Sequence, residues 1–127
     1  MLDSDGEYAS LNTNCFYAPK NGISLEFIAA FCSSKVFMFL YRQLFGALRM
    51  SGGYFQFQSP QLRAIPIRQP PRDQQDFVKV VRDLTAAMKS RPRDAGTTAT
   101  LFAKLNHLIY RLYDLTDAEI AALDSPE

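Results

Sequence analysis

The sequence is poor in the side chains that build metal sites and disulfide-stapled scaffolds. Its 127 residues include one histidine, His107, and two cysteines, Cys15 and Cys32. One imidazole cannot form a histidine metal cage, and two cysteines without metal-ligand spacing form neither a zinc motif nor a disulfide framework. We therefore expect no metal site, and we expect both cysteines to be buried, reduced thiols of a cytoplasmic protein.

An excess of charge of one sign is also missing. Fourteen basic and 13 acidic residues give a net charge of +1, which argues against a DNA binder that relies on bulk charge but leaves room for a local basic patch. The acidic, polar start MLDSDGEYAS does not resemble a signal peptide. The most apolar segment, residues 25–48, is interrupted by Glu26, Lys35 and Arg42, whereas a membrane span needs about 20 predominantly apolar residues. We predict a core helix there and no membrane partner.

Catalytic motifs are absent as well. There is no nucleophile elbow, phosphate-binding glycine loop or acidic metal cluster. The tetrapeptide Gln-Pro-Pro-Arg at residues 69–72 shares two prolines with the Asn-Pro-Pro-aromatic motif of amino-methyltransferases. That motif uses a short amide or acid to hold the target amine and an aromatic ring to stack on a flipped base. Here the amide is one carbon longer and arginine replaces the aromatic residue, so we interpret the tetrapeptide as a linker. We predict no catalytic residue, no cofactor in this chain and no enzymatic activity of the chain alone.

Apolar side chains are abundant. A hydrophobic fraction of 47%, with ten phenylalanines, is typical of a folded domain. Ser24 is predicted to cap the long apolar helix over residues 25–48. Residues 11–18 and the alternating segment 54–58 are predicted to be strands, and residues 65–67 to be an extended edge segment.

The second half predicts helices. After the linker, Asp73 is expected to cap a helix, and two apolar repeats predict an antiparallel helical hairpin. The repeats are Phe77, Val80, Val81, Leu84 and Met88, and then Leu101, Phe102, Leu105, Leu108, Ile109 and Leu112. A polar loop over residues 90–98 is expected between them, and a capping box at residues 116–119 predicts a last short helix.

The predicted fold class is therefore α+β, dominated by helices, with a small strand set packed on a long apolar helix and a C-terminal helical hairpin. Residues 1–69 are predicted to form one functional unit and residues 70–127 a helical segment.

Polar and basic side chains gather around the segment 54–58. Arginine suits phosphates and guanine edges, glutamine can bind adenine through two hydrogen bonds, and a serine beside glycine amides can contact a phosphate. From these residues alone, an ordinary edge strand with a polar outer face is the more frequent explanation, and a DNA-binding surface is the alternative. The candidate DNA-binding residues are Arg42, Arg49, Ser51, Tyr54, Gln56, Gln58 and Arg63.

Several motifs follow one another in a family-like order. They are LNTN at residues 11–14, FCSSK at 31–35, RMSGGYFQF at 49–57, LRAIPI at 62–67 and LNHLIYRLYDLTDAEIAAL at 105–123. Together they resemble the TaqI-like C-terminal specificity domain of type II restriction–modification enzymes and related phage-defence adenine methyltransferases.

The resemblance implies a target-recognition module for duplex DNA, residues 1–69 being the distal part of such a domain. The module would serve an adenine-N6 DNA methyltransferase, whose catalytic domain or subunit would be its partner and would hold S-adenosylmethionine. The competing interpretation is a protein-interaction module, in which the leucine seam of residues 101–112 docks the methyltransferase or a second copy of the chain as a homodimer.

Overall fold

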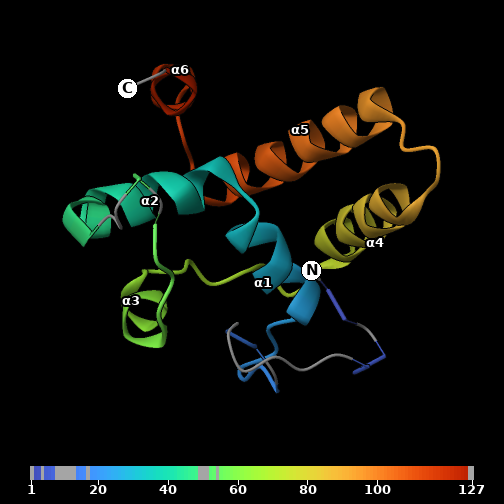
Figure 1. Cartoon of the computed structure of the whole chain (residues 1–127), viewed down its shortest axis with the longest axis horizontal. Helices are drawn as coiled ribbons and strands as arrows, with labels where there is room; N and C mark the ends of the chain where they lie inside the picture. Colours follow the sequence, from blue (N-terminus) through green and yellow to red (C-terminus); the bar gives the residue numbers. More distant parts are fainter. Residues whose placement is uncertain are drawn as a thin grey trace.

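The fold is built from helices. The computed structural model describes residues 2–3, 5–7, 14–16, 18–48, 52–53 and 55–125. Its elements are α1 (Leu25–Cys32), α2 (Lys35–Phe45), the short 3-10 helix η1 (Gly46–Leu48), α3 (Ser59–Ala64), α4 (Gln75–Lys89), α5 (Ala95–Leu112) and α6 (Asp117–Asp124) (Figure 1). Helix dominance is confirmed, but the predicted strand set is wrong, because the described residues contain no strand beyond a single bridge residue, Phe55.

The physical reason for this error lies in what the alternating side chains contact. Phe55 and Phe57 pack against α2, with ring centroids 5.7 Å and 4.5 Å from that of Tyr41. An alternation of apolar and polar residues reports burial on one side only. Here a helix supplies that apolar side. Residues 14–16 and 65–67 also lack regular strand structure, although Ile65 has the extended backbone expected before a proline. Residues 11–13, 17 and 54 lie outside the described residues.

The long apolar helix is in fact two helices. Ser24 caps α1 as predicted, its Oγ accepting the N–H of Phe27 at 3.0 Å. Ser34 then caps α2: its Oγ accepts the N–H of Phe37 at 3.2 Å and donates to the carbonyl of Phe31 at 2.6 Å. The extended backbone of an N-cap residue cannot continue a helix, so the chain changes direction at this point.

The helices α4 and α5 form the predicted antiparallel hairpin, and α1 packs against α4 (Figure 1). Asp73 accepts the N–H of Gln75 at 3.0 Å, although Gln74 is the N-cap residue of α4. The loop between the two helices is shorter than predicted, because Asp94 caps α5 by accepting the N–H of Gly96 at 2.9 Å.

A single hydrophobic core joins the two halves of the chain. Phe27 of α1 and Phe77 of α4 meet edge to face with centroids 5.1 Å apart. Leu105 and Ile109 of α5 belong to the same buried cluster, as does Phe31 of α1. The leucine seam of α5 therefore packs against the core of its own chain. Its buried residues, Leu105 and Ile109, are not available to a partner.

The last helix, α6, begins with the predicted capping box. Thr116 Oγ1 accepts the N–H of Glu119, and the carboxylate of Glu119 accepts the N–H of Thr116 at 2.8 Å. An ion pair between Lys35 and Asp124 links α6 to the start of α2. In the described part of the chain, no helix combines the length and apolar character needed to cross a bilayer.

Candidate nucleic-acid interface

The middle of the chain is free of acidic residues. From residue 27 to residue 72 there is no aspartate or glutamate, and the six basic residues are Lys35, Arg42, Arg49, Arg63, Arg68 and Arg72. These 46 residues carry a net charge of +6, while the rest of the chain has eight basic and 13 acidic residues, a net charge of −5. The near-neutral total therefore hides a basic region that contains α2, α3 and the segment 55–58.

Among the described residues, two of these charges have acidic partners. Lys35 pairs with Asp124, and Arg68 Nη2 lies 3.1 Å from Asp114 Oδ2. The backbone N–H of Arg68 also donates to the hydroxyl of Tyr113 at 3.0 Å, which fixes the exit from α3 to the end of α5. Within the described residues, Arg42 and Arg63 form no ion pair.

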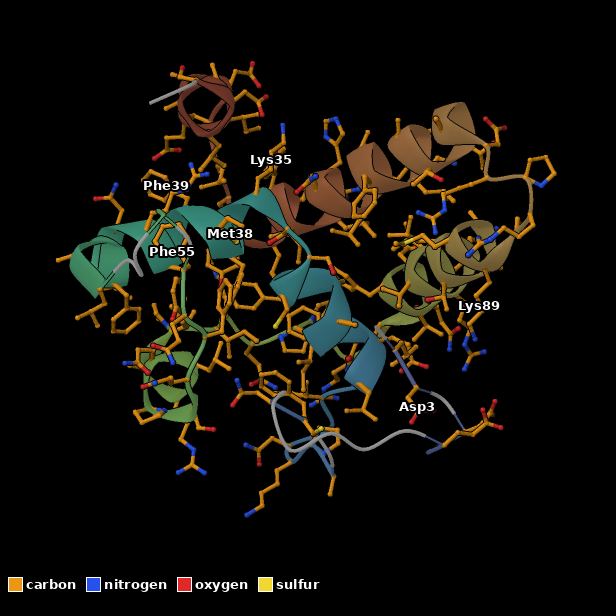
Figure 2. The ribbon with its side chains drawn as sticks, in the orientation of Figure 1. Asp3, Lys35, Met38, Phe39, Phe55 and Lys89 are labelled. Atoms are coloured by element: carbon orange, nitrogen blue, oxygen red, sulfur yellow. The ribbon has the colours of Figure 1, made fainter. Side chains whose placement is uncertain are left out.

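Tyr41 holds the segment 55–58 against α2. Its side chain is 1% exposed, and its hydroxyl donates to the carbonyl oxygen of Gln56 at 2.5 Å. Burial raises the pKa of Tyr41, so the hydroxyl keeps its proton near neutral pH and remains a donor. Figure 2 shows Phe55 beside α2, where its ring packs on that of Tyr41.

This attachment leaves the two glutamines of the segment exposed. The rings of Phe55 and Phe57 contact Tyr41 of α2, although Phe57 is still 39% exposed, and Gln56 and Gln58 are exposed as well. Gln58 is the N-cap residue of α3, yet its side chain makes no capping hydrogen bond. Both glutamines are thus exposed on a segment whose backbone Tyr41 holds by a hydrogen bond.

Asn14 connects the start of α3 to the segment before it through two hydrogen bonds. Its Nδ2 donates to the carbonyl of Phe57 at 2.7 Å, and its Oδ1 accepts from Ser59 Oγ at 2.9 Å. Ile65, 8% exposed, anchors the other end of α3 in the core. Arg63 is exposed in the last turn of this short helix. Sequence reasoning missed Asn14, since a polar residue in the LNTN motif does not indicate a contact 43 residues away.

The predicted interface is therefore only partly described. Arg42, Gln56, Gln58 and Arg63 are all exposed. Arg42 directly follows Tyr41 on α2, so its side chain leaves the helix about 100° around the axis from the residue that holds the segment 55–58. Arg49, Ser51 and Tyr54 lie outside the described residues.

The other reactive side chains are scattered. Among the described residues, no three His, Cys, Asp or Glu side chains come together as a possible metal site. Both cysteines are free. The prediction that both are buried is wrong for Cys15, which is exposed, because its segment runs along the outside of the fold. Cys32 is half-buried, and burial raises its pKa to about 11. His107 is exposed on α5 beside Tyr110.

An apolar groove lies between α2 and α6. Its volume is about 210 Å³. Its lining residues come from α2, from the turn after α5 and from α6: Val36, Phe39, Leu40, Tyr113, Leu115, Glu119, Ala122 and Leu123. The Phe39 side chain is 42% exposed at this groove, and Figure 2 shows it on α2 on the side nearer α6.

Comparison of the chain with protein-family models, with curated proteins and with solved structures found no match.

Proposed function

We propose that the chain is a non-catalytic target-recognition module for duplex DNA, working with a cytoplasmic, S-adenosylmethionine-dependent adenine-N6 methyltransferase or restriction–modification enzyme. The observation that carries the proposal is the acid-free stretch of residues 27–72, with its net charge of +6. The methyltransferase context rests on the motif resemblance, and so does a role in phage defence.

The described side chains support two kinds of contact. Arg42 and Arg63 are exposed and unpaired within the described residues, and guanidinium groups bind phosphates and guanine edges through paired N–H donors. Gln56 and Gln58 present amides, which can recognise adenine in the major groove through two hydrogen bonds. Because Tyr41 and Asn14 already fix the backbone at residues 56 and 57, little ordering entropy would be lost on binding.

The test compares two double variants that remove the same charge. Arg42→Gln/Arg63→Gln is expected to weaken binding to duplex DNA by on the order of tenfold at low salt, since each lost phosphate contact also reduces counterion release. Lys79→Gln/Lys104→Gln, on the exposed faces of α4 and α5, is the control and should have a smaller effect. Fluorescence anisotropy at several salt concentrations measures both. Equal affinity of the two variants would rule out this contact surface.

The groove between α2 and α6 favours a second candidate function, a protein-interaction module that docks the methyltransferase subunit. The seam of α5 is occupied by the chain's own core, so this interpretation now depends on the groove. Phe39→Ser should weaken co-sedimentation with the catalytic subunit, because it removes an exposed ring from the groove lining. Leu44→Ser, 52% exposed on the same helix but outside that lining, is the matched control. Loss of association in both variants alike would argue against a specific role of the groove.

A further inference from the structure

The connection between α4 and α5 concentrates positive charge at one end of the molecule. Lys89, Arg91 and Arg93 fall within five residues, and all three are exposed. Residues 84–93 contain no acidic residue, so this stretch carries +3 in a chain whose total is +1. The connection lies at the end of the long axis opposite α2 and α3 (Figure 1), and Figure 2 shows Lys89 near it, at the end of α4.

Stabilisation of α4 accounts for part of this cluster. Cations are favourable near the negative end of a helix dipole, and Lys89 is in the last turn of α4. Arg91 Nη1 donates to the carbonyl oxygens of Met88 at 3.1 Å and Ser90 at 2.9 Å. A guanidinium has five N–H donors, so the donors on Nη2 and Nε of Arg91 remain for a ligand. Its charge is held in place by the two carbonyls and is not neutralised by them.

The nearest acid in the sequence is already engaged. Asp94 follows Arg93 directly, but its carboxylate accepts the N–H of Gly96 at 2.9 Å and the hydroxyl of Thr97 at 2.6 Å. Within the described residues, none of the three cations forms an ion pair. No ion pair within the described residues neutralises the charge of the connection, although the ionised Asp94 beside Arg93 offsets part of it.

We propose that Lys89, Arg91 and Arg93, here called the basic tip, form a second phosphate-contact surface for the backbone of duplex DNA. This inference rests on the proposed function. Arginine is suited to phosphate recognition, and phosphate contacts position a protein on DNA without reading its sequence. The basic tip thus adds affinity equally to every sequence. Because it and α3 lie toward opposite ends of the long axis (Figure 1), one straight duplex reaches both only when it runs along that axis.

The surroundings favour DNA over a membrane surface. Interfacial membrane helices place Trp, Phe or Leu beside their basic residues. Residues 88–93 contain no Trp, Phe or Leu, and their apolar side chains are Met88, 41% exposed, and Pro92. A cationic surface with so little apolar area next to it suits a hydrophilic polyanion.

The experiment compares two triple variants with equal net charge. Lys89→Gln/Arg91→Gln/Arg93→Gln removes the basic tip, and Lys20→Gln/Lys79→Gln/Lys104→Gln removes three exposed charges elsewhere. Either change takes the net charge from +1 to −2. Affinities for two duplexes of equal length and different sequence are measured over a range of salt concentrations. The tip variant should bind both on the order of tenfold more weakly, and its salt slope should fall by about 0.9 per lost phosphate contact, while the control keeps its slope.

A second variant distinguishes the loss of DNA contacts from a destabilisation of the end of α4. Lys89→Gln/Arg93→Gln keeps the Arg91 bonds to the helix end and should show about two thirds of the slope change seen for the triple variant. If the wild-type chain binds DNA and the tip variants keep its salt slope, the tip inference is wrong and the proposed function stands. If the wild-type chain binds no duplex at all, the proposed function fails. Tip-dependent binding to phosphatidylserine vesicles instead of DNA would overturn the inference in favour of a membrane surface.

Discussion

Three polar side chains fix the path of the backbone from positions distant in the sequence. Tyr41 binds the carbonyl of Gln56, Asn14 binds that of Phe57, and Asn106 Oδ1 accepts the N–H of Lys35 at 2.9 Å. None of these contacts could be predicted from the sequence, because a side chain that bonds a remote main-chain group carries no local signal. Asn106 gives only an indirect hint, as a buried amide in the apolar seam of α5 must find partners.

The Tyr41 hydroxyl should contribute measurably to stability. Tyr41→Phe keeps the ring packing but leaves the carbonyl of Gln56 without its donor, so we expect the free energy of unfolding to fall by about 1 kcal/mol. Urea denaturation followed by circular dichroism measures the change. Tyr110→Phe, whose hydroxyl has no hydrogen bond among the described residues, serves as the control. Wild-type stability for Tyr41→Phe would show that this bond does not hold the segment 55–58.

At the scale of single elements, the sequence signals for helix caps were reliable, whereas the alternation used to predict strands was not. The caps at Ser24 and Thr116 were correctly predicted, because a capping hydrogen bond spans only three residues. The break at Ser34 was missed, although a serine pair inside an apolar helix is a possible cap. The strand prediction at residues 54–58 was wrong, because Phe55 and Phe57 pack on a helix and not within a sheet.

Two helix caps should make stability sensitive to acid. Hydrogen bonds from Thr97 and Gly96 lower the pKa of Asp94 below its usual value of 3.8, and those from Thr116 lower the pKa of Glu119 below 4.5. A carboxyl whose pKa is depressed on folding stabilises the fold above its unfolded pKa, and this contribution disappears as the pH falls through the folded pKa. The free energy of unfolding should therefore decline as the pH drops below about 4.5.

Variants of these caps separate their contribution from general acid effects. Asp94→Asn and Glu119→Gln should be less stable at pH 7 and should lose less stability between pH 7 and pH 3 than the wild type. Asp83→Asn, at an exposed carboxyl of α4 without a hydrogen bond in the described structure, is the control. Urea denaturation at both pH values provides the comparison. A cap variant with the wild-type loss on acidification would contradict this account.

At the scale of the whole molecule, the sequence predicted a helical hairpin but not what the hairpin packs against. The boundary predicted at residues 69 and 70 rests on composition. The hydrophobic core extends across it, because Phe27 contacts Phe77 and because Leu105 and Ile109 belong to the same cluster. Tertiary partners are not encoded in an apolar repeat, which tells only which face of a helix is buried.

Because one hydrophobic core contains residues from both halves of the chain, the protein should unfold in one cooperative transition. Leu105→Ala creates a cavity at a side chain that is 1% exposed, so we expect a loss of about 2–5 kcal/mol. Leu44→Ala, at a 52% exposed position, should change stability by about 0.5 kcal/mol or less. Hydrogen exchange of the amides in α1 and in α5 should report the same loss for Leu105→Ala. Destabilisation confined to α4 and α5 would show that the two halves unfold independently.

The uneven distribution of charge gives this nearly neutral chain an electric polarity. The helix α6 carries three acidic residues, Asp117, Glu119 and Asp124, and no basic residue, and it lies across α2 from α3 (Figure 1). Arg63 of α3 forms no ion pair within the described residues. In the field of a polyanion such a body experiences a torque, because one side is attracted while the other is repelled. The molecule would thus rotate its α3 side forward before contact is made. A larger fraction of collisions would then begin with the α3 side facing the DNA. This increase in association rate would become smaller as added salt screens the field.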